Sequence, residues 1–350
     1  MTTEQIAPAA IGGRLATAAP SRLIGIGHYF PGEPVTNAYF EQQLPSLGID
    51  DDWIREHTGI RSRHWPDTDD ERAVEMGARA VEAALKDAGL APQDIDLVVG
   101  TTSTTRPRAN PSSATNRYMD ISLPLQKQVG LHNAFCFDVG AVACAGFLYS
   151  SVVACSLMAT LGARNALVVC AENPKPILNF DYRYSVLFGA GGAAAVWQRG
   201  TDGGKDGAGA GPGLLDAVFN SDGRYFDAFD IDDDDKMIMK GKQVGAVGPT
   251  MLSAAARAVL TRNGLTKDDI DWFIPHQGNL NMIRQVCADL ELPEERVLVN
   301  IGHRGNTSSV SIPSCLSEQV AAGTVKPGDL LLSIGIGRGF NSGAVLFRYR

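Results

Sequence analysis

One cysteine stands where an apolar run meets the start of an expected helix. Cys144 lies in residues 138–147 (DVGAVACAGF), among small and apolar neighbours. Residues 145–161 are almost all apolar or small, which is typical of a helix buried on most of its circumference. We expect a thiol at such a helix N-terminus to favour the thiolate, because unpaired N–H groups and the positive end of the helix dipole stabilise it. A buried structural cysteine is the alternative for this residue taken alone.

Two later motifs supply side chains that could assist such a nucleophile. Residues 275–279 (PHQGN) follow the apolar run 272–274, so His276 is expected at the end of a strand. Residues 305–309 (GNTSS) precede another expected helix and place Asn306 in a loop. A nucleophilic cysteine with His and Asn far away in sequence but adjacent in the fold is a constellation for covalent acyl transfer. The alternatives are a surface histidine and an asparagine that caps a helix or braces its loop.

Together the three motifs resemble the ketoacyl-acyl-carrier-protein synthase III family of the thiolase superfamily, and the resemblance covers nearly the whole chain. It implies an acyltransferase whose Cys144 takes an acyl primer from a coenzyme A or carrier-protein thioester. His276 and Asn306 would then assist decarboxylative condensation with a malonyl thioester. The family also implies an oxyanion site made of the backbone N–H groups of Cys144 and Arg338, although a glycine is usual at the second position.

Two other functions stay open at this point. An acyltransferase of the same fold could pass the acyl group to an oxygen or nitrogen nucleophile, as in secondary metabolism. The presence of both His276 and Asn306 favours condensation, because transfer to a heteroatom does not require an enolate site. The other alternative is a non-catalytic partner subunit that only shapes a pocket, and the intact Cys144 argues against it.

The resemblance also assigns residues to the substrate's nucleotide and pantetheine arm. Trp53 matches the residue that stacks on the adenine of coenzyme A, and Lys175 matches an arginine on the other face. Gly241 and Asn279 complete the predicted coenzyme A and phosphopantetheine contacts. The chain departs from the family nearby, since His57 and Asn281 stand at positions where arginine is usual.

The predicted acyl pocket has lost bulk relative to the family. Asn110 and Gly245 stand where large aromatic residues are common, which predicts a primer longer or bulkier than acetyl. The alternative is that neighbouring side chains fill the space. Residues 188–192 (FGAGG) also lack the acidic residue of the family's FGDGA segment.

An internal repeat indicates the fold. Residues 78–100 and 253–275 align without gaps, with Gly89 on Gly264 and DID on DID, and the offset is half of the 350 residues. Each copy predicts a helix, a turn and an apolar strand, which indicates an α/β fold. The resemblance implies the thiolase fold, with duplicated halves in a five-layered αβαβα arrangement. We expect halves at residues 1–200 and 214–350, joined by the Gly-rich connection 201–213.

Composition restricts the partners and the compartment. The net charge is −8 with a pI near 5.3, which argues against non-specific nucleic-acid binding. The six cysteines form no CxxC pair, and we expect no metal site. The acidic run 232–235 is expected to be a solvated loop. No signal sequence or confident membrane span is evident, so a cytoplasmic protein is expected. The resemblance further implies a homodimer and no resident cofactor, the thioester being a substrate.

Overall fold

Two β-sheets form the frame of the computed structural model, which describes residues 21–68, 71–104, 120–140, 142–200 and 213–350. The first sheet has the strand order β1 (Ser21–Tyr29), β7 (Gly191–Arg199), β6 (Asn165–Glu172), β4 (Leu97–Thr101) and β5 (Phe135–Asp138). The second sheet has the order β11 (Trp272–Pro275), β12 (Leu330–Gly337), β13 (Gly339–Arg348) and β8 (Gly213–Tyr225). Of the expected connection 201–213, only Gly213 lies among the described residues.

The two sheets have the same strand directions. In the first sheet β7 is antiparallel to β1 and β6, while β6, β4 and β5 are parallel. In the second sheet β13 is antiparallel to β8 and β12, and β12 is parallel to β11. A parallel bridge from Phe273 on β11 to Val297 stands where β5 stands in the first sheet. The two halves are therefore copies of one topology.

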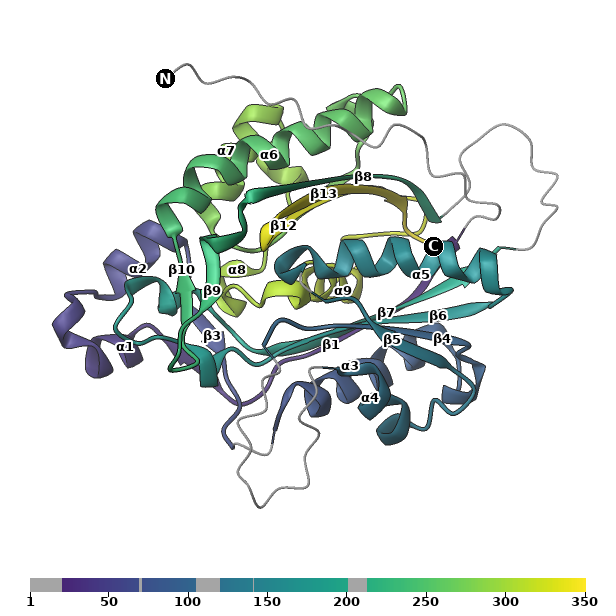
Figure 1. Cartoon of the computed structure of the whole chain (residues 1–350). Coiled ribbons are helices and arrows are strands. Elements are labelled where there is room, and N and C mark those ends of the chain that lie inside the picture. The colour runs from purple at the N-terminus through teal and green to yellow at the C-terminus, as the bar shows by residue number, and fades with distance from the viewer. Residues whose placement is uncertain (1–20, 69–70, 105–119, 141, 201–212) are drawn as a thin grey trace.

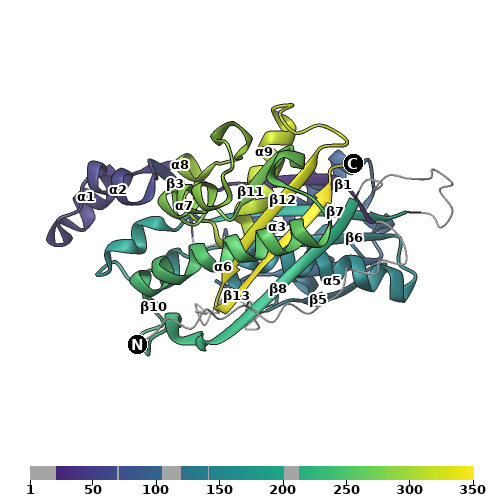
Figure 2. The ribbon, with the colours of Figure 1, turned by 90° about the horizontal axis from the view of Figure 1, so that it is seen from above.

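Helices cover both outer faces and fill the space between the sheets (Figure 1). The outer face of the first sheet carries α3 (Ala73–Ala88) and α4 (Ser122–Val129). Between the sheets lie α5 (Gly146–Leu161) and α9 (Ser311–Ala321). The outer face of the second sheet carries α6 (Gly241–Arg262), seen crossing β8, β13 and β12 in Figure 2, with α7 (Leu280–Leu290) beside it. The predicted αβαβα layering is confirmed.

Shorter elements border the layers and appear on the left of Figure 1. Within the described residues they form two strand pairs, β2 with β3 and β9 with β10, and three short helices. Their bounds are β2 (Pro34–Thr36), β3 (Ser62–His64), β9 (Phe229–Ile231), β10 (Met237–Met239), α1 (Ala38–Gln43), α2 (Asp51–Thr58) and α8 (Ile301–Arg304). The predicted solvated loop 232–235 is the turn between β9 and β10.

The repeated sequence produces the same local structure in both halves. Gly89 follows α3 with a φ of +66°, and Gly264 stands just beyond α6 with a φ of +67°. This left-handed conformation is one that glycine adopts without a steric penalty. In the next turn, Asp94 and Asp269 each accept the backbone N–H three residues earlier, at 2.8 and 2.7 Å. The identical DID segments are therefore the positions that shape the turn and start the strand.

Two long apolar helical segments pack against the sheets. Ala143–Leu161 and Gly241–Arg262 are long and apolar enough to cross a membrane by length and composition alone. The first contains α5, which packs against strands of both sheets, and the second is α6, which packs on the second sheet. Contact with the sheets accounts for the composition of both helices.

The close packing of α3 on β1 generates a stability prediction. A Cβ atom on Gly27 would lie 2.4 Å from the backbone N of Ala84 in α3, so Gly27→Ala must push the helix away. We expect it to lower the free energy of unfolding by about 3 kcal/mol. Gly223→Ala is the control, since no heavy atom lies within 4 Å of the added Cβ. Urea unfolding of both variants checks this, and equal stability would contradict it.

Candidate active site

Cys144 lies in a sharp turn between β5 and α5. It is the middle residue of the 3₁₀ turn Ala143–Ala145, which runs directly into α5. Ala143 has a φ of +42°, a left-handed conformation that is uncommon for alanine and redirects the chain just before the cysteine. The end of β12 packs against this turn, because a Cβ on Gly337 would lie 1.9 Å from the carbonyl oxygen of Val142. The turn is thus held between elements of both halves.

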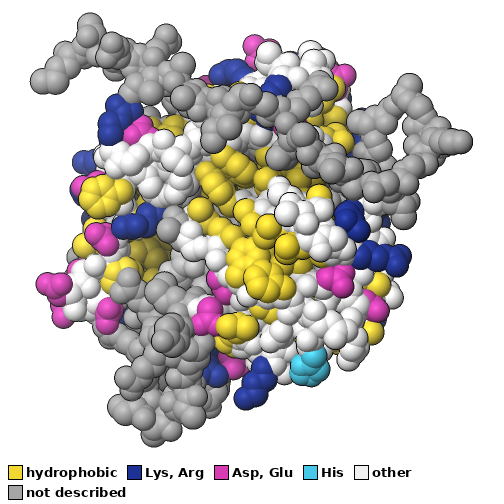
Figure 3. All heavy atoms as spheres, turned by 45° about the vertical axis from the view of Figure 1, so that its right-hand side comes forward, with side chains coloured by type: hydrophobic (Ala, Val, Ile, Leu, Met, Phe, Trp, Pro, Cys, Tyr) yellow, Lys and Arg dark blue, Asp and Glu magenta, His cyan; other side chains and the backbone are white. Residues whose placement is uncertain are grey.

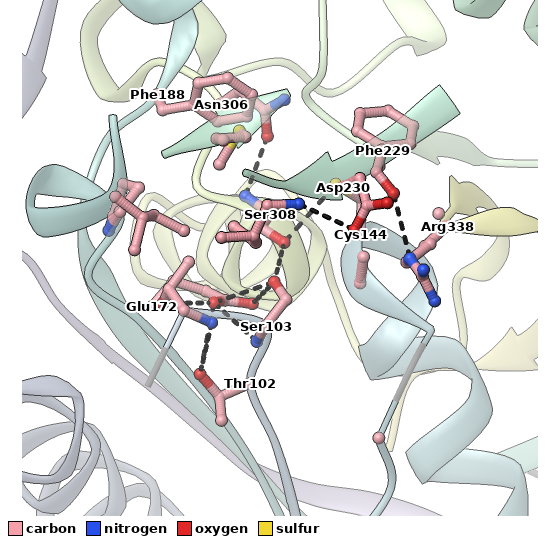
Figure 4. A pocket seen from close by; sticks show the side chains of 18 of the residues that line it. Thr102, Ser103, Cys144, Glu172, Phe188, Phe229, Asp230, Asn306, Ser308 and Arg338 are labelled. Atoms are coloured by element: carbon pink, nitrogen blue, oxygen red, sulfur yellow. Dashed lines mark hydrogen bonds between the residues drawn. The ribbon is translucent and has the colours of Figure 1, made fainter. Parts of the chain in front are cut away.

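Two cavities meet at the cysteine. The first has a volume of about 400 Å³ and the second about 270 Å³. Three residues, Cys144, Asn306 and Phe229, line both cavities, and His276 lines the second. Figure 4 shows the first cavity, with Cys144 and Asn306 on its wall. The fold therefore brings the three residues predicted from distant motifs to one place.

His276 follows β11 and is held as a neutral ring. Its Nδ1 lies 2.7 Å from the hydroxyl of Ser311, which also accepts the N–H of Gln277 at 3.3 Å. This contact is compatible with both tautomers of the ring, because the hydroxyl can donate to Nδ1 or accept from an Nδ1–H. Burial lowers the pKa of His276 to about 4. A Cβ on Gly278 would lie 2.7 Å from Nε2, and glycine keeps that side of the ring open.

Asn306 is fixed by its backbone and by one side-chain atom. Its N–H donates to Leu187 at 2.7 Å, and its carbonyl accepts from Gly189 at 3.0 Å. Its Oδ1 accepts the N–H of Ser308 at 2.9 Å. The Nδ2 group, which points away from Ser308 in Figure 4, is the part of the amide that can donate into the cavities.

The electrostatics of Cys144 differ from the expectation for a helix N-terminus. Burial raises the pKa of Cys144 to about 12, opposed by a hydrogen bond to Ser308 and reinforced by the charge of Glu172. The thiol donates to the Ser308 hydroxyl at 3.5 Å. The prediction that the thiolate is favoured is therefore wrong for this arrangement, because enclosure of the sulfur outweighs the helix N-terminus.

Arg338 occupies the turn between β12 and β13 and lines the first cavity beside Cys144. Its carbonyl accepts the N–H of Asn341 at 3.0 Å, which closes the turn. Its Nε donates to the carbonyl of Phe229 at 3.1 Å, so the side chain that replaces the usual glycine extends towards the β9–β10 hairpin. The role of its backbone N–H in an oxyanion site stays a prediction.

The residues predicted to hold the nucleotide are arranged differently from the expectation. Trp53, on α2, stacks on His57 with ring centroids 4.3 Å apart. The cation beside Trp53 is Arg183, whose guanidinium lies 5.7 Å from the ring centroid. Lys175 is exposed and donates to the carbonyl of Pro66 at 3.4 Å. The geometry thus favours Arg183 over Lys175 as the partner of Trp53. Arg183 and Trp53 are far apart in the sequence, and only the fold brings them together.

The second cavity contains most of the other predicted contacts. Gly241, Gly245 and Asn279 line it, whereas Asn110 lies outside the described residues. Asn279 accepts the N–H of Asn281 at 2.8 Å as the cap of α7 and donates to the carbonyl of His57 at 3.0 Å. Its amide therefore joins α7 to α2. Gly245 faces open space, since no heavy atom lies within 4 Å of an added Cβ. Gly245 lines the second cavity, together with His276, and does not line the first cavity.

The sequence analysis missed one buried acid. Glu172, the last residue of β6, is fully buried and lines the first cavity. Its partners are hydroxyl and N–H groups from residues 102–104 and from Ser309. The Thr- and Ser-rich run 101–104 was the available signal, and it becomes informative only when the fold places it beside β6. Among the described residues no group of three His, Cys, Asp or Glu side chains is placed to hold a metal ion.

Comparisons with known proteins identify the family of the chain. Residues 137–223 match the family model for 3-oxoacyl-[acyl-carrier-protein (ACP)] synthase III, and residues 260–349 match its C-terminal model. Beta-ketoacyl-[acyl-carrier-protein] synthase III of Ruegeria sp. (strain TM1040) is 38% identical, with 93% of this chain and 98% of that protein covered. The enzyme of the same name from Rhodobacter capsulatus is also 38% identical, with the same coverage of both proteins.

Solved structures give the same result. The 3-oxoacyl-[acyl-carrier-protein] synthase III from Aquifex aeolicus VF5 superposes with a TM-score of 0.83 at 31% identity, covering 94% of this chain and 100% of that one. The priming beta-ketosynthase from the R1128 polyketide biosynthetic pathway has a TM-score of 0.83 at 31% identity, covering 97% and 98%. The predicted thiolase fold and the predicted family are confirmed.

The buried neutral His276 predicts a pH dependence of stability. Its pKa of about 4 in the folded protein lies below the ordinary 6.5, so between these values the unfolded chain binds a proton that the folded protein does not. The free energy of unfolding should therefore fall as the pH drops from 6.5 to 4, with His276 contributing up to about 3 kcal/mol. In His276→Gln, urea unfolding at pH 4.5 and pH 7 should differ by less than in the unmodified protein. An unchanged difference would contradict the neutral assignment.

Proposed function

Because the chain belongs to the 3-oxoacyl-[acyl-carrier-protein] synthase III family of enzymes, we propose that it joins an acyl primer to a malonyl thioester and releases carbon dioxide and a β-ketoacyl product. The observation that carries the proposal is the position of Cys144 at the junction of two cavities. One cavity carries the apolar side chains of Ile177, Ile231 and Met237 on its wall, and the other presents His276. The acyl chain and the malonyl thioester can thus lie on different sides of one sulfur.

The first half-reaction loads the primer. The sulfur of Cys144 attacks the carbonyl carbon of an acyl thioester, and the acyl group moves to the cysteine as the substrate thiol leaves. The backbone N–H groups of Cys144 and Arg338 stabilise the oxyanion. The acyl chain enters the first cavity, where Ile177, Ile231 and Met237 supply an apolar lining.

The second half-reaction forms the carbon–carbon bond. The Nε2–H of His276 and the Nδ2 group of Asn306 donate to the thioester oxygen of the malonyl group, where negative charge develops as carbon dioxide leaves. The enolate carbon then attacks the acyl group on Cys144. A neutral His276 suits this step. Its lowered pKa keeps the ring neutral, and a neutral ring can donate a hydrogen bond to the thioester oxygen.

The thioester arms are proposed to reach Cys144 through the second cavity, past Gly241 and Asn279. Trp53 and Arg183 would stack on the nucleotide of coenzyme A, and an acyl-carrier protein is the other proposed donor. The thioester is a substrate, and no resident cofactor is proposed. The R1128 relative suggests a polyketide pathway as an alternative to fatty acid synthesis.

We also propose a cytoplasmic homodimer. Hydrophobic side chains gather on one face of the molecule, shown in Figure 3. Three large hydrophobic side chains of the first half are more than half exposed, namely Leu123 on α4, Phe135 on the edge strand β5 and Leu161 on α5. An edge strand with an exposed aromatic residue is a natural pairing surface for a second copy.

Separating the half-reactions tests the proposed function. Cys144→Ala should form no acyl adduct in a mass measurement after incubation with an acyl thioester. Asn306→Ala should still acylate but lose condensation by on the order of 10²–10³-fold, because one enolate donor is gone. Cys155→Ala is the control and should keep both steps, since Cys155 is buried in the core away from the cavities. An acyl adduct on Cys144→Ala would refute the assignment, and an O- or N-acyl product would favour the alternative acceptor.

The size of the first cavity predicts a preference for long primers. Each methylene buried there adds about 0.8 kcal/mol, so six- to eight-carbon acyl thioesters should react better than acetyl in a primer panel. Ile231→Trp would fill the first cavity and should shift the preference towards acetyl. Gly245→Phe would narrow the second cavity, and it should raise the KM for the malonyl thioester without changing primer preference. A strict acetyl preference in the unmodified protein would show that other residues close the pocket.

A further inference from the structure

Glu172 is a buried carboxylate whose partners, among the residues that the structure describes, are hydroxyl and N–H groups. It accepts from the hydroxyls of Thr102, Ser103, Thr104 and Ser309 and from the backbone N–H groups of Ser103 and Ser309. Within the described part of the chain no Lys, Arg or His forms an ion pair with it. A carboxylate on the wall of the nucleophile's cavity, surrounded by hydroxyl groups that can carry protons, is a candidate for a role in the chemistry.

A chain of hydrogen bonds joins this carboxylate to the nucleophile, and Figure 4 shows its members. The thiol of Cys144 lies 3.5 Å from the hydroxyl of Ser308. That hydroxyl lies 3.1 Å from the hydroxyl of Ser103. The Ser103 hydroxyl lies 3.1 and 3.2 Å from the two oxygens of Glu172. Sequence positions 103, 144, 172 and 308 are thus connected through three contacts.

The number of protons fixes the direction of this chain. Ser103 has one hydroxyl proton, and the carboxylate of Glu172 can only accept, so Ser103 donates to Glu172. Ser103 must then accept from Ser308, and the proton of Ser308 is committed to that contact. Ser308 is left to accept from the thiol of Cys144. Every proton in the chain points from the sulfur towards the carboxylate.

The histidine of the site is paired elsewhere. Its Nδ1 lies 2.7 Å from the hydroxyl of Ser311, and among the described residues the hydrogen bond of the Cys144 thiol goes to Ser308 and not to His276. Burial raises the pKa of the Cys144 thiol to about 12, so the thiol must lose its proton during attack. The hydroxyl of Ser308 is the acceptor that the structure places beside it.

We propose that Ser308, Ser103 and Glu172 form a proton relay that takes the thiol proton of Cys144 during acylation, which rests on the proposed thioester chemistry. As the sulfur–carbon bond forms, the S–H bond breaks and its proton moves to Ser308. The Ser308 proton moves to Ser103, and the Ser103 proton moves to Glu172, which becomes a neutral acid. When the substrate thiolate leaves, the same path returns one proton to it. The enzyme ends as the acyl-cysteine with Glu172 ionised again, and the thiol product carries the proton.

The surroundings of Glu172 suit this task, because hydroxyl and N–H donors contact both of its oxygens. The final acceptor need not be a strong base, since an S–H group becomes strongly acidic as its sulfur bonds to a carbonyl carbon. Cys144 acts on the substrate directly, while Ser308, Ser103 and Glu172 act through it.

A pair of substitutions at one position tests the relay. Ser103→Ala removes the middle hydroxyl, and Ser103→Thr keeps it. In single-turnover assays with an octanoyl-coenzyme A substrate, Ser103→Ala and Glu172→Gln should release the thiol product about 10²-fold more slowly, with little change in KM. Ser103→Thr should recover most of the rate. The relay is refuted if Ser103→Ala acylates at the unmodified rate, or if Ser103→Thr is as slow as Ser103→Ala.

Alkylation of Cys144 by iodoacetamide separates the relay from a damaged fold. The charge of Glu172 raises the pKa of Cys144, so Glu172→Gln should be alkylated at lower pH than the unmodified protein. In Glu172→Gln the thiol of Cys144 should therefore ionise at lower pH, and yet the acylation of Cys144 should be slower. A variant slow in both reactions would indicate structural damage and count against the relay. If the unmodified protein takes acyl groups from no thioester, the proposed function fails and the relay fails with it.

Discussion

The contact between the end of β12 and the Cys144 turn is the constraint on which the site depends. Gly337 touches this turn so closely that any side chain at its position would overlap the carbonyl of Val142. The contact belongs to both halves, since Cys144 comes from the first and β12 from the second. It sets the distance between the sheets at the point where the chemistry takes place, and the loops carrying His276 and Asn306 are built on that same second half.

His276 and Asn306 are held beside the cysteine by different kinds of contact. His276 is placed by the end of a strand and by one hydroxyl on α9, the helix that shares the central layer with α5. Asn306 is placed by backbone hydrogen bonds to Leu187 and Gly189, residues of the first half. The histidine is thus held by a strand and a helix of its own half. The asparagine is hydrogen-bonded directly to the opposite half.

The sequence analysis succeeded where residues that are close together in the sequence indicate the function. The motifs around Cys144, His276 and Asn306 are local, and the repeated DID turns predicted the duplication because they shape helix–turn–strand units. It failed where three-dimensional proximity decides. Glu172 and Arg183 have no local motif, since their partners come from distant segments. The acidity of Cys144 was misjudged for the same reason, because the helix start is visible in the sequence and the enclosure of the sulfur is not.

The central layer has a consequence for the origin of the chain. α5 belongs to the first half but also packs on strands of the second sheet, and α9 belongs to the second half but packs on β1 and β7. A half standing alone would expose an apolar helix and the inner face of a sheet to water. An ancestor of half this length would therefore need a second copy of itself to bury these surfaces, whereas joining both halves in one chain makes their association independent of protein concentration.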